Sequence, residues 1–274
     1  MTLETLLKAL HYREAVEEVV KASIKKNTRK ISELAKTAYE GENFDFPLCR
    51  RMPLTRLAVL TFLLVQKYAD YHAMGVPDEM IFDTFQDVSL RAELYFQKSG
   101  KPGITKVDVI WFRHIIHTEI FKIGPLQYQP FAMVYLDQET LGEPYMTFDP
   151  DQKKRLPPGT PVINCHIPQG ADLSAEAVED SMAKAKKFFA VHFPGIPYRA
   201  FLCYSWLLYP PMAAQLPKDS NIRQFARRFT ILGSLAGREE VKKYIEKRNP
   251  PTTLEIMFSQ HRDWFGFSCG IMEL

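Results

Sequence analysis

The chain has 274 residues, of which 46% are hydrophobic and 24% charged, and 35 lysines and arginines almost balance 32 aspartates and glutamates. This is the composition of an ordinary globular protein, long enough to bury one large core or two modest ones. The small net charge of +3 does not favour a nucleic-acid-binding surface or a strongly electrostatic membrane surface, so we expect neither partner.

The cysteines and the N-terminus bear on the compartment. The chain has four cysteines, Cys49, Cys165, Cys203 and Cys269. They form no CxxC pair, so we predict free buried thiols and no metal site. The N-terminus is acidic from Glu4 onward and resembles neither a signal peptide nor a membrane span. The most apolar run, residues 57–65, is well short of the roughly 20 residues that a membrane helix needs. The predicted protein is soluble and cytoplasmic.

Residues 3–98 carry apolar side chains at helical spacing and show no period-two alternation. This pattern predicts four or five helices, separated by Gly- and Pro-containing breaks at 41–53, 75–77 and 99–103. A further helix follows within residues 104–121. Thr105 is its expected N-cap, and Asp108 lies where a capping box needs an acceptor.

From residue 124 the pattern changes to strands that alternate with single helices. Strands are predicted at 126–136, 162–167, 198–208 and 265–272, and helices at 174–192, 222–230 and 239–247. Pro130 is expected to restrict its strand to an edge or a bulge. The predicted fold class is therefore α+β, with a helical N-terminal domain at 1–123 and a mixed α/β C-terminal domain at 124–274.

Polar residues alternate onto one face of the strand at 162–167. Asn164 and His166 share that face, and Gln127 and Gln129 repeat the pattern on the first strand. Buried polar groups need partners, so this face either meets other polar residues or lines a solvated cleft. Two hypotheses remain open for His166, a structurally hydrogen-bonded histidine and a catalytic or ligand-binding one.

The loop at 168–172 leads into the predicted N-terminus of the helix at 174–192, a position that attracts anions such as phosphate. Gly170 allows a ligand to approach the backbone closely. However, the loop matches neither a Walker pattern nor GxGxxG, and Asp172, Glu176 and Glu179 place negative charge beside it.

Other groups give weaker signals. Ser181 and Ser205 are not in a GxSxG motif, and no base is apparent near Cys203, so nucleophilic catalysis is not favoured. His114 and His117 are three residues apart, but Glu119 is not expected on the same helix face, so a metal site is not predicted.

Three arginines lie together in the helix predicted at 222–230: Arg223, Arg227 and Arg228. They form either a solvated surface or an anion contact.

Several short motifs occur in a fixed order between residues 166 and 229. They are HIPQGADL at 166–173, DS at 180–181, FF at 188–189, FP at 193–194, CYSWLL at 203–208, LP at 216–217 and SNI at 220–222, followed by Phe225 and Phe229. With the segment IGPLQYQ at 123–129, they resemble a bacterial family of acyltransferase-domain-containing proteins. Members of that family have a helical N-acyltransferase-type N-terminal domain and a GNAT-like C-terminal domain.

The resemblance implies a GNAT-like sheet in which the strands at 162–167 and 198–208 splay apart to admit the acyl-pantetheine arm of acyl-CoA, the implied co-substrate. The pyrophosphate would then lie at the loop that contains Gln169, Gly170 and Ala171. The loop supplies the Gln and one Gly of the wider GNAT pattern, but not its second glycine.

Two functions follow from these observations. The first is an N-acyltransferase that moves an acyl group from acyl-CoA to an amine of a small molecule or peptide, with His166 as the general base. Its substrate contacts would come from Asn164, Ser205, Trp206 and Asn221. The second, motivated by the missing glycine and the nearby acids, is a non-catalytic ligand-binding or sensor module on a GNAT-like scaffold.

Overall fold

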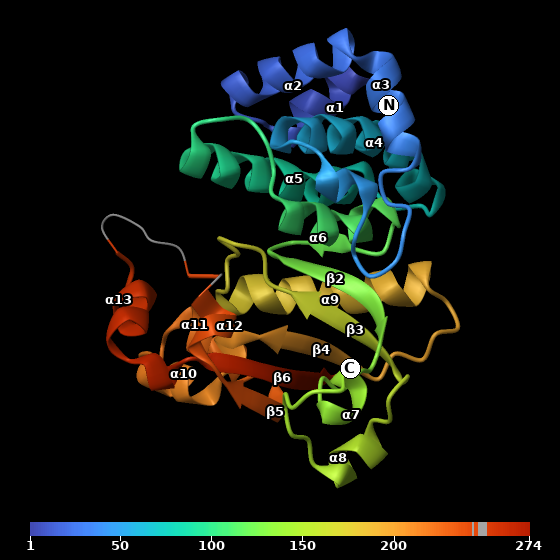
Figure 1. Ribbon diagram of the computed structural model, residues 1–274. Coiled ribbons are helices and arrows are strands. Elements are labelled where there is room, and N and C mark those ends of the chain that lie inside the picture. Colours follow the sequence, from blue (N-terminus) through green and yellow to red (C-terminus); the bar gives the residue numbers. More distant parts are fainter. Residues whose placement is uncertain (243, 246–250) are drawn as a thin grey trace. The chain divides into compact units, whose positions relative to one another are not determined.

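A computed structural model describes residues 1–242, 244–245 and 251–274 of the chain (Figure 1). The chain separates into two compact units, Met1–Lys122 and Ile123–Leu274. The first unit is helical, and the second contains a mixed sheet with helices, which confirms the predicted α+β class. Within the described residues, no helix has both the length and the apolar character that a bilayer crossing requires.

The first unit is built around one long buried helix. Its elements are α1 (Leu3–Leu10), α2 (Glu14–Lys26), α3 (Thr28–Lys36), η1 (Pro47–Arg50), α4 (Pro53–Ala73), α5 (Asp78–Ser99) and α6 (Lys106–Ile116). α4 contacts α1, α2, α3, α5 and α6, and it carries the apolar run at 57–65. The capping box of α6 forms as predicted, because Asp108 N donates to Thr105 Oγ1 and Thr105 N donates to Asp108 Oδ2.

The second unit is organised by a six-stranded sheet in the order β1-β2-β3-β4-β6-β5 (Figure 1). Its strands are β1 (Phe121–Ile123), β2 (Leu126–Ala132), β3 (Pro161–His166), β4 (Ala200–Ser205), β5 (Thr230–Ala236) and β6 (Gly266–Glu273). β2 pairs with β3, and β6 with both β4 and β5, in antiparallel fashion, whereas β3 and β4 are parallel. β2 lies between β1 and β3 and its register with β3 is unbroken through Pro130, so the expectation that Pro130 restricts its strand to an edge or a bulge is wrong.

The helices of the second unit are mostly short. They are α7 (Gln138–Leu141), α8 (Pro150–Arg155), α9 (Ala175–His192), α10 (Pro210–Gln215), α11 (Asn221–Ala226), α12 (Arg238–Lys242) and α13 (Thr253–Gln260), with 3-10 turns η2 (Trp206–Leu208) and η3 (Arg262–Trp264). α9 agrees with the predicted helix at 174–192, but α11 ends at Ala226 because the chain turns into β5, which was not predicted. The last part of the helix expected at 239–247 lies outside the described residues.

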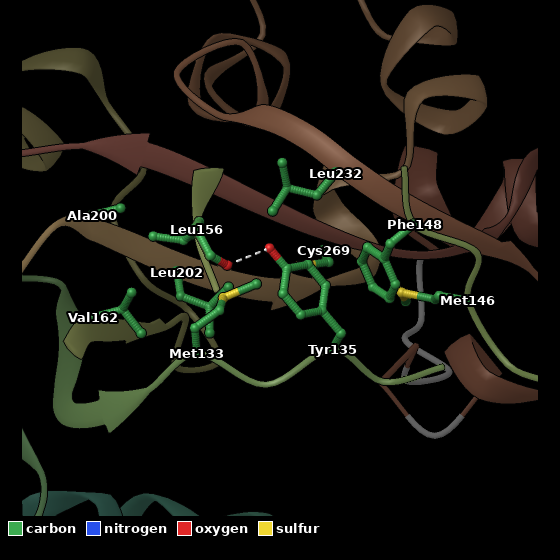
Figure 2. Close-up of a cluster of buried hydrophobic side chains, with 10 residues drawn as sticks. All are labelled: Met133, Tyr135, Met146, Phe148, Leu156, Val162, Ala200, Leu202, Leu232 and Cys269. Carbon is green, nitrogen blue, oxygen red and sulfur yellow. Dashed lines mark hydrogen bonds between the residues drawn. The ribbon is translucent and has the colours of Figure 1, made fainter. Parts of the chain in front are cut away.

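The two faces of the sheet bury different side chains. On one face, β2 packs against α9, where Tyr128 Oη and Ser181 Oγ are 2.8 Å apart. On the opposite face lies an apolar cluster, to which the segment between β2 and β3 contributes its own side chains (Figure 2). The members of this apolar cluster are Met133, Tyr135, Met146, Phe148, Leu156, Val162, Ala200, Leu202, Leu232 and Cys269. Tyr135 Oη donates to the Leu156 carbonyl oxygen, so this hydrogen bond joins two residues of the segment between β2 and β3.

Candidate active site

The backbone pairing between β3 and β4 stops partway along the strands. Two residue pairs join them, Ile163 with Phe201 and Asn164 with Leu202, whereas β4 stays paired with β6 through Ser205. The ladder that joins β3 and β4 therefore ends at Asn164 and Leu202. Backbone N–H and C=O groups farther along the facing edges of the two strands are not part of this ladder. Such edges can bind an extended chain that has amide groups of its own.

Four polar side chains lie on β2 and β3, on the sheet face that carries the apolar cluster. We call Gln127, Gln129, Asn164 and His166 the polar row. Gln127 is the cross-strand partner of His166 and Gln129 that of Asn164, so the antiparallel register places all four on one face. Gln127, Gln129 and Asn164 are buried, whereas His166 is half-buried. The register thus brings together the two strands whose polar alternation was noted in the sequence.

His166 is the last residue of β3, two residues beyond Asn164, where the register of β3 with β4 ends. Its Nε2 lies 3.3 Å from Gln129 Oε1. An amide oxygen only accepts, so in this contact His166 Nε2 is the donor and Gln129 Oε1 the acceptor. The glutamine thereby restrains the orientation of the ring.

The loop after β3 forms a tight turn before α9. Ala171 N donates to the Pro168 carbonyl oxygen over 3.1 Å, and Gly170 has φ +77°, a left-handed conformation that favours glycine. A Cβ built on Gly170 would meet no atom within 4 Å, so the space beside this backbone is open. Gln169 and Gly170 are exposed and Ala171 is half-buried.

The N-terminus of α9 lacks a side-chain cap. Ser174 occupies the N-cap position, but its side chain makes no capping hydrogen bond, while Asp172 Oδ1 accepts from Ser174 N over 2.9 Å. The N-cap residue therefore supplies no side-chain acceptor to the N–H groups of the first helical turn, which suits an anionic ligand.

One arginine of the predicted cluster lies against the first turn of α9. Arg228 Nη2 donates to Glu179 Oε1 over 2.7 Å and is 3.5 Å from the Ala175 carbonyl oxygen. Arg223 instead donates to the Leu216 carbonyl oxygen after α10, so its role is structural, and Arg227 is exposed. Sequence patterns do not indicate which arginine reaches α9, because that contact joins segments far apart in the chain.

The remaining predicted contacts are distributed around the ends of β4 and α11. Ser205 ends β4, and its Oγ accepts from Leu207 N over 3.1 Å, which caps η2. Trp206 is half-buried, with its ring 6.4 Å from that of Phe265. Asn221 is exposed at the first position of α11.

Tyr204 lies on the same sheet face as the polar row, although the sequence analysis did not single it out. It is on β4, one step beyond Cys203. Its hydroxyl donates to the Val134 carbonyl oxygen over 2.7 Å, and burial raises the pKa of Tyr204 well above its usual range. A hydroxyl that is already bonded within the protein and has a raised pKa is a poor proton donor to a ligand.

The buried nucleophiles lie on the other face and have structural roles. Ser181 Oγ donates to the Ile123 carbonyl oxygen. A hydrogen bond with Cys165, together with burial, raises the pKa of the Cys203 thiol. Both cysteines are buried, so their thiols are inaccessible.

A correction concerns His114 and Glu119. Glu119 was expected off the histidine face, but its Oε2 lies 3.1 Å from His114 Nδ1 because α6 ends at Ile116 and the chain turns back, with Thr118 at φ +58°. Within the residues that the structure describes, no group of three or more His, Cys, Asp or Glu side chains is arranged to hold a metal ion.

Comparisons with solved structures agree with this architecture. An acyltransferase in complex with decanoyl-CoA and teicoplanin has a TM-score of 0.72 and 19% sequence identity, and the match covers 99% of this chain and 87% of that one. An acyltransferase in complex with decanoyl-CoA has a TM-score of 0.71 and 22% identity over the same shares of the two chains. At these identities the likeness shows the fold. A comparison with curated protein sequences gives no match.

Two family profiles match the chain in succession. Residues 1–118 match the N-acyltransferase N-terminal domain, and residues 120–258 match the GNAT-like C-terminal domain. Both domains of the resemblance proposed from the short motifs are thus confirmed. The chain belongs to the family of proteins with a GNAT-like C-terminal domain, preceded by an N-acyltransferase N-terminal domain.

Proposed function

We propose that this chain is a cytoplasmic N-acyltransferase, which transfers an acyl group from acyl-CoA to an amine of a small molecule or peptide. The observation that carries the proposal is the end of β3, where its pairing with β4 stops beside the polar row, a point that we call the opening. Support comes from the family membership and from the fold shared with acyltransferases solved in complex with decanoyl-CoA and teicoplanin.

Acyl-CoA fits the second unit in two places. The pantetheine arm has amide groups that can pair with the open edges of β3 and β4 beyond Asn164 and Leu202. The pyrophosphate would accept hydrogen bonds from the backbone near Gly170 and from the uncapped first turn of α9. Arg228 would turn from Glu179 to a phosphate oxygen, which replaces one charge-assisted hydrogen bond by another.

His166 would act as the general base. The amine nitrogen attacks the thioester carbonyl carbon, a C–N bond forms and the C–S bond breaks, and coenzyme A leaves as its thiolate, which becomes a thiol with the proton that His166 has taken from the amine. His166 Nδ1 takes the proton that the amine loses, while Gln129 holds Nε2. Asn164, Ser205, Trp206 and Asn221 remain proposed substrate contacts, and of these Asn164 is the one placed beside the base.

The experiment is a thiol-release assay with purified protein, several acyl-CoA chain lengths and a panel of amino sugars and peptide amines. The proposal expects thiol release that depends on both the acyl-CoA and the amine. Absence of amine-dependent thiol release with every pair would refute the enzymatic activity.

One observation favours a second candidate, a non-catalytic ligand-binding or sensor module. The exposed acids Asp172, Glu176 and Glu179 surround the loop that would hold the pyrophosphate, and the loop lacks the second glycine. This alternative predicts binding of acyl-CoA without thiol release, so binding and turnover measured on the same preparation separate the two.

A further inference from the structure

Gln127 is a buried polar side chain with an unused donor. Its exposed fraction is 2%, and its Nε2 is buried without a hydrogen-bond partner. Buried amide groups in folded proteins nearly always have partners, because an unpaired donor loses its hydrogen bonds to water and gains none in return. Gln129, two residues along β2, shows the ordinary case, since its amide oxygen contacts His166.

The position of Gln127 relative to the base indicates what would satisfy this donor. The strands lie in the order β2-β3-β4, so His166 on β3 stands between Gln127 on β2 and the opening at β4. Adjacent strands are about 4.8 Å apart, which places Gln127 one strand farther from the opening than the base. The thioester would lie at the opening, so Gln127 adjoins the other reactant, the amine that His166 deprotonates.

We propose that Gln127 binds the amine acceptor by donating its Nε2–H to an oxygen atom near the reactive amino group. This inference rests on the proposed function. It makes the acceptor an amine with a neighbouring carbonyl or hydroxyl oxygen, as in amino amides and amino sugars, in preference to a simple alkylamine. An apolar amine would leave the donor unpaired in the complex, whereas an oxygen-bearing amine satisfies it.

The test compares matched amines in the wild type and in Gln127→Met, which keeps the length of the side chain and removes the donor. Glycinamide supplies a carbonyl oxygen, glucosamine supplies hydroxyl oxygens, and propylamine supplies neither. Each amine is compared with itself in the two proteins, so differences in amine basicity cancel. The readout is kcat/KM for thiol release at saturating acyl-CoA.

We expect Gln127→Met to lower kcat/KM about 10- to 100-fold for the oxygen-bearing amine that binds, and to change it less than about 2-fold for propylamine. A lower kcat/KM with glycinamide alone identifies a carbonyl oxygen as the partner of the Gln127 donor. A lower kcat/KM with glucosamine alone identifies a hydroxyl oxygen. The KM for acyl-CoA should not change. An equal loss for all three amines, or no loss for any, would overturn the inference.

A second glutamine serves as the matched control. Gln86 Nε2 donates to the Ala9 carbonyl oxygen over 3.0 Å, so its donor is already used within the protein. Gln86→Met should lower thermal stability and leave the preference among the three amines unchanged. A preference that changed equally in both variants would assign the effect to stability and contradict the role of Gln127.

Direct binding separates this inference from the proposed function. If the wild type released no thiol from any acyl-CoA, the enzymatic activity would fail, but calorimetric titration of the three amines would still decide the role of Gln127. Tighter binding of an oxygen-bearing amine that disappears in Gln127→Met supports the inference. If that variant does not fold, equal affinity of the wild type for all three amines overturns it, and a preference for oxygen supports it.

Discussion

The apolar cluster and the polar row lie at two ends of one sheet face, and they differ in whether their side chains find packing or hydrogen-bond partners within the chain. At the apolar cluster, the segment between β2 and β3 supplies Tyr135 and Phe148, whose rings pack edge to face at 4.8 Å (Figure 2). At the polar row, three of four side chains are buried, and one of them has an unpaired donor. The first end is completed by side chains of the chain itself, whereas at the second end we propose that the amine acceptor pairs with the Gln127 donor.

This difference separates stability from function. Close packing of apolar side chains stabilises a fold, so a change in the apolar cluster should act mainly on the free energy of unfolding. An unpaired buried donor lowers stability and is retained where a ligand uses it. A change in the polar row should therefore act mainly on turnover.

The largest expected effect is that of His166→Ala at the polar row. Removal of a general base lowers kcat/KM by about 10²- to 10⁴-fold, while the midpoint of thermal unfolding should change little. The measurement is amine-dependent thiol release. His72→Ala is the control, because His72 is exposed on α4 and should leave turnover unchanged. Unchanged turnover in His166→Ala would remove this residue from the mechanism.

The apolar cluster is tested by Phe148→Ala. Phe148 is buried, and the substitution should lower the free energy of unfolding by about 3–5 kcal/mol through lost burial and the cavity that remains. Denaturant unfolding measures the change. Gln127→Met, at the other end of the same face, should leave that free energy unchanged or raise it. A loss below about 1 kcal/mol for Phe148→Ala would contradict the close packing of this cluster.

A smaller effect is expected at the first turn of α9. Arg228→Gln removes the cation that would bind a phosphate oxygen, and should weaken acyl-CoA binding about five- to tenfold. Glu179→Gln removes the competing carboxylate and should strengthen that binding. Calorimetry on the two variants measures both shifts. The same direction of change in both would exclude the exchange of partners that we propose.

The smallest expected effect is on the stability of the helical unit, where the partly exposed ion pair of Arg13 and Glu93 contributes little. Arg13 Nε donates to Glu93 Oε2 over 2.9 Å, and its hydrogen bonds lower the pKa of Glu93 from 4.5 to about 2. A lowered carboxyl pKa contributes stability that is present above pH 4.5 and is lost as the pH falls toward 2. Because the pair is partly exposed, solvent screening limits this contribution to at most about 1 kcal/mol.

Unfolding at pH 6 and pH 3 checks this sign. The wild type should lose more stability than Glu93→Gln between the two values, by no more than about 1 kcal/mol. A larger loss in the variant would contradict the direction of the pKa shift.

Sequence reasoning succeeded where local interactions decide the structure. The capping box at Thr105 and Asp108 and the helix α9 both depend on residues close in sequence. Strand β5 was missed because a helix was predicted at 222–230, while the pairing with β6 that determines β5 is not local. His114 and Glu119 show the same limit, since their contact depends on where α6 ends.

The sequence predicted which residues form the candidate site better than it predicted how they are arranged in space. Alternation placed Asn164 with His166 on one strand face and indicated the two glutamines on another strand. Only the antiparallel register, which the sequence does not specify, makes Gln127 the partner of His166 and leaves its donor unpaired. The contact of Arg228 with α9 likewise depends on tertiary packing.

Calorimetric titration of the purified protein with acetyl-CoA and longer acyl-CoAs tests the central claim most directly. The open edges of β3 and β4 and the uncapped first turn of α9 predict saturable, one-to-one binding that raises the midpoint of thermal unfolding. No heat and no thermal shift at high concentrations of every acyl-CoA would contradict the account.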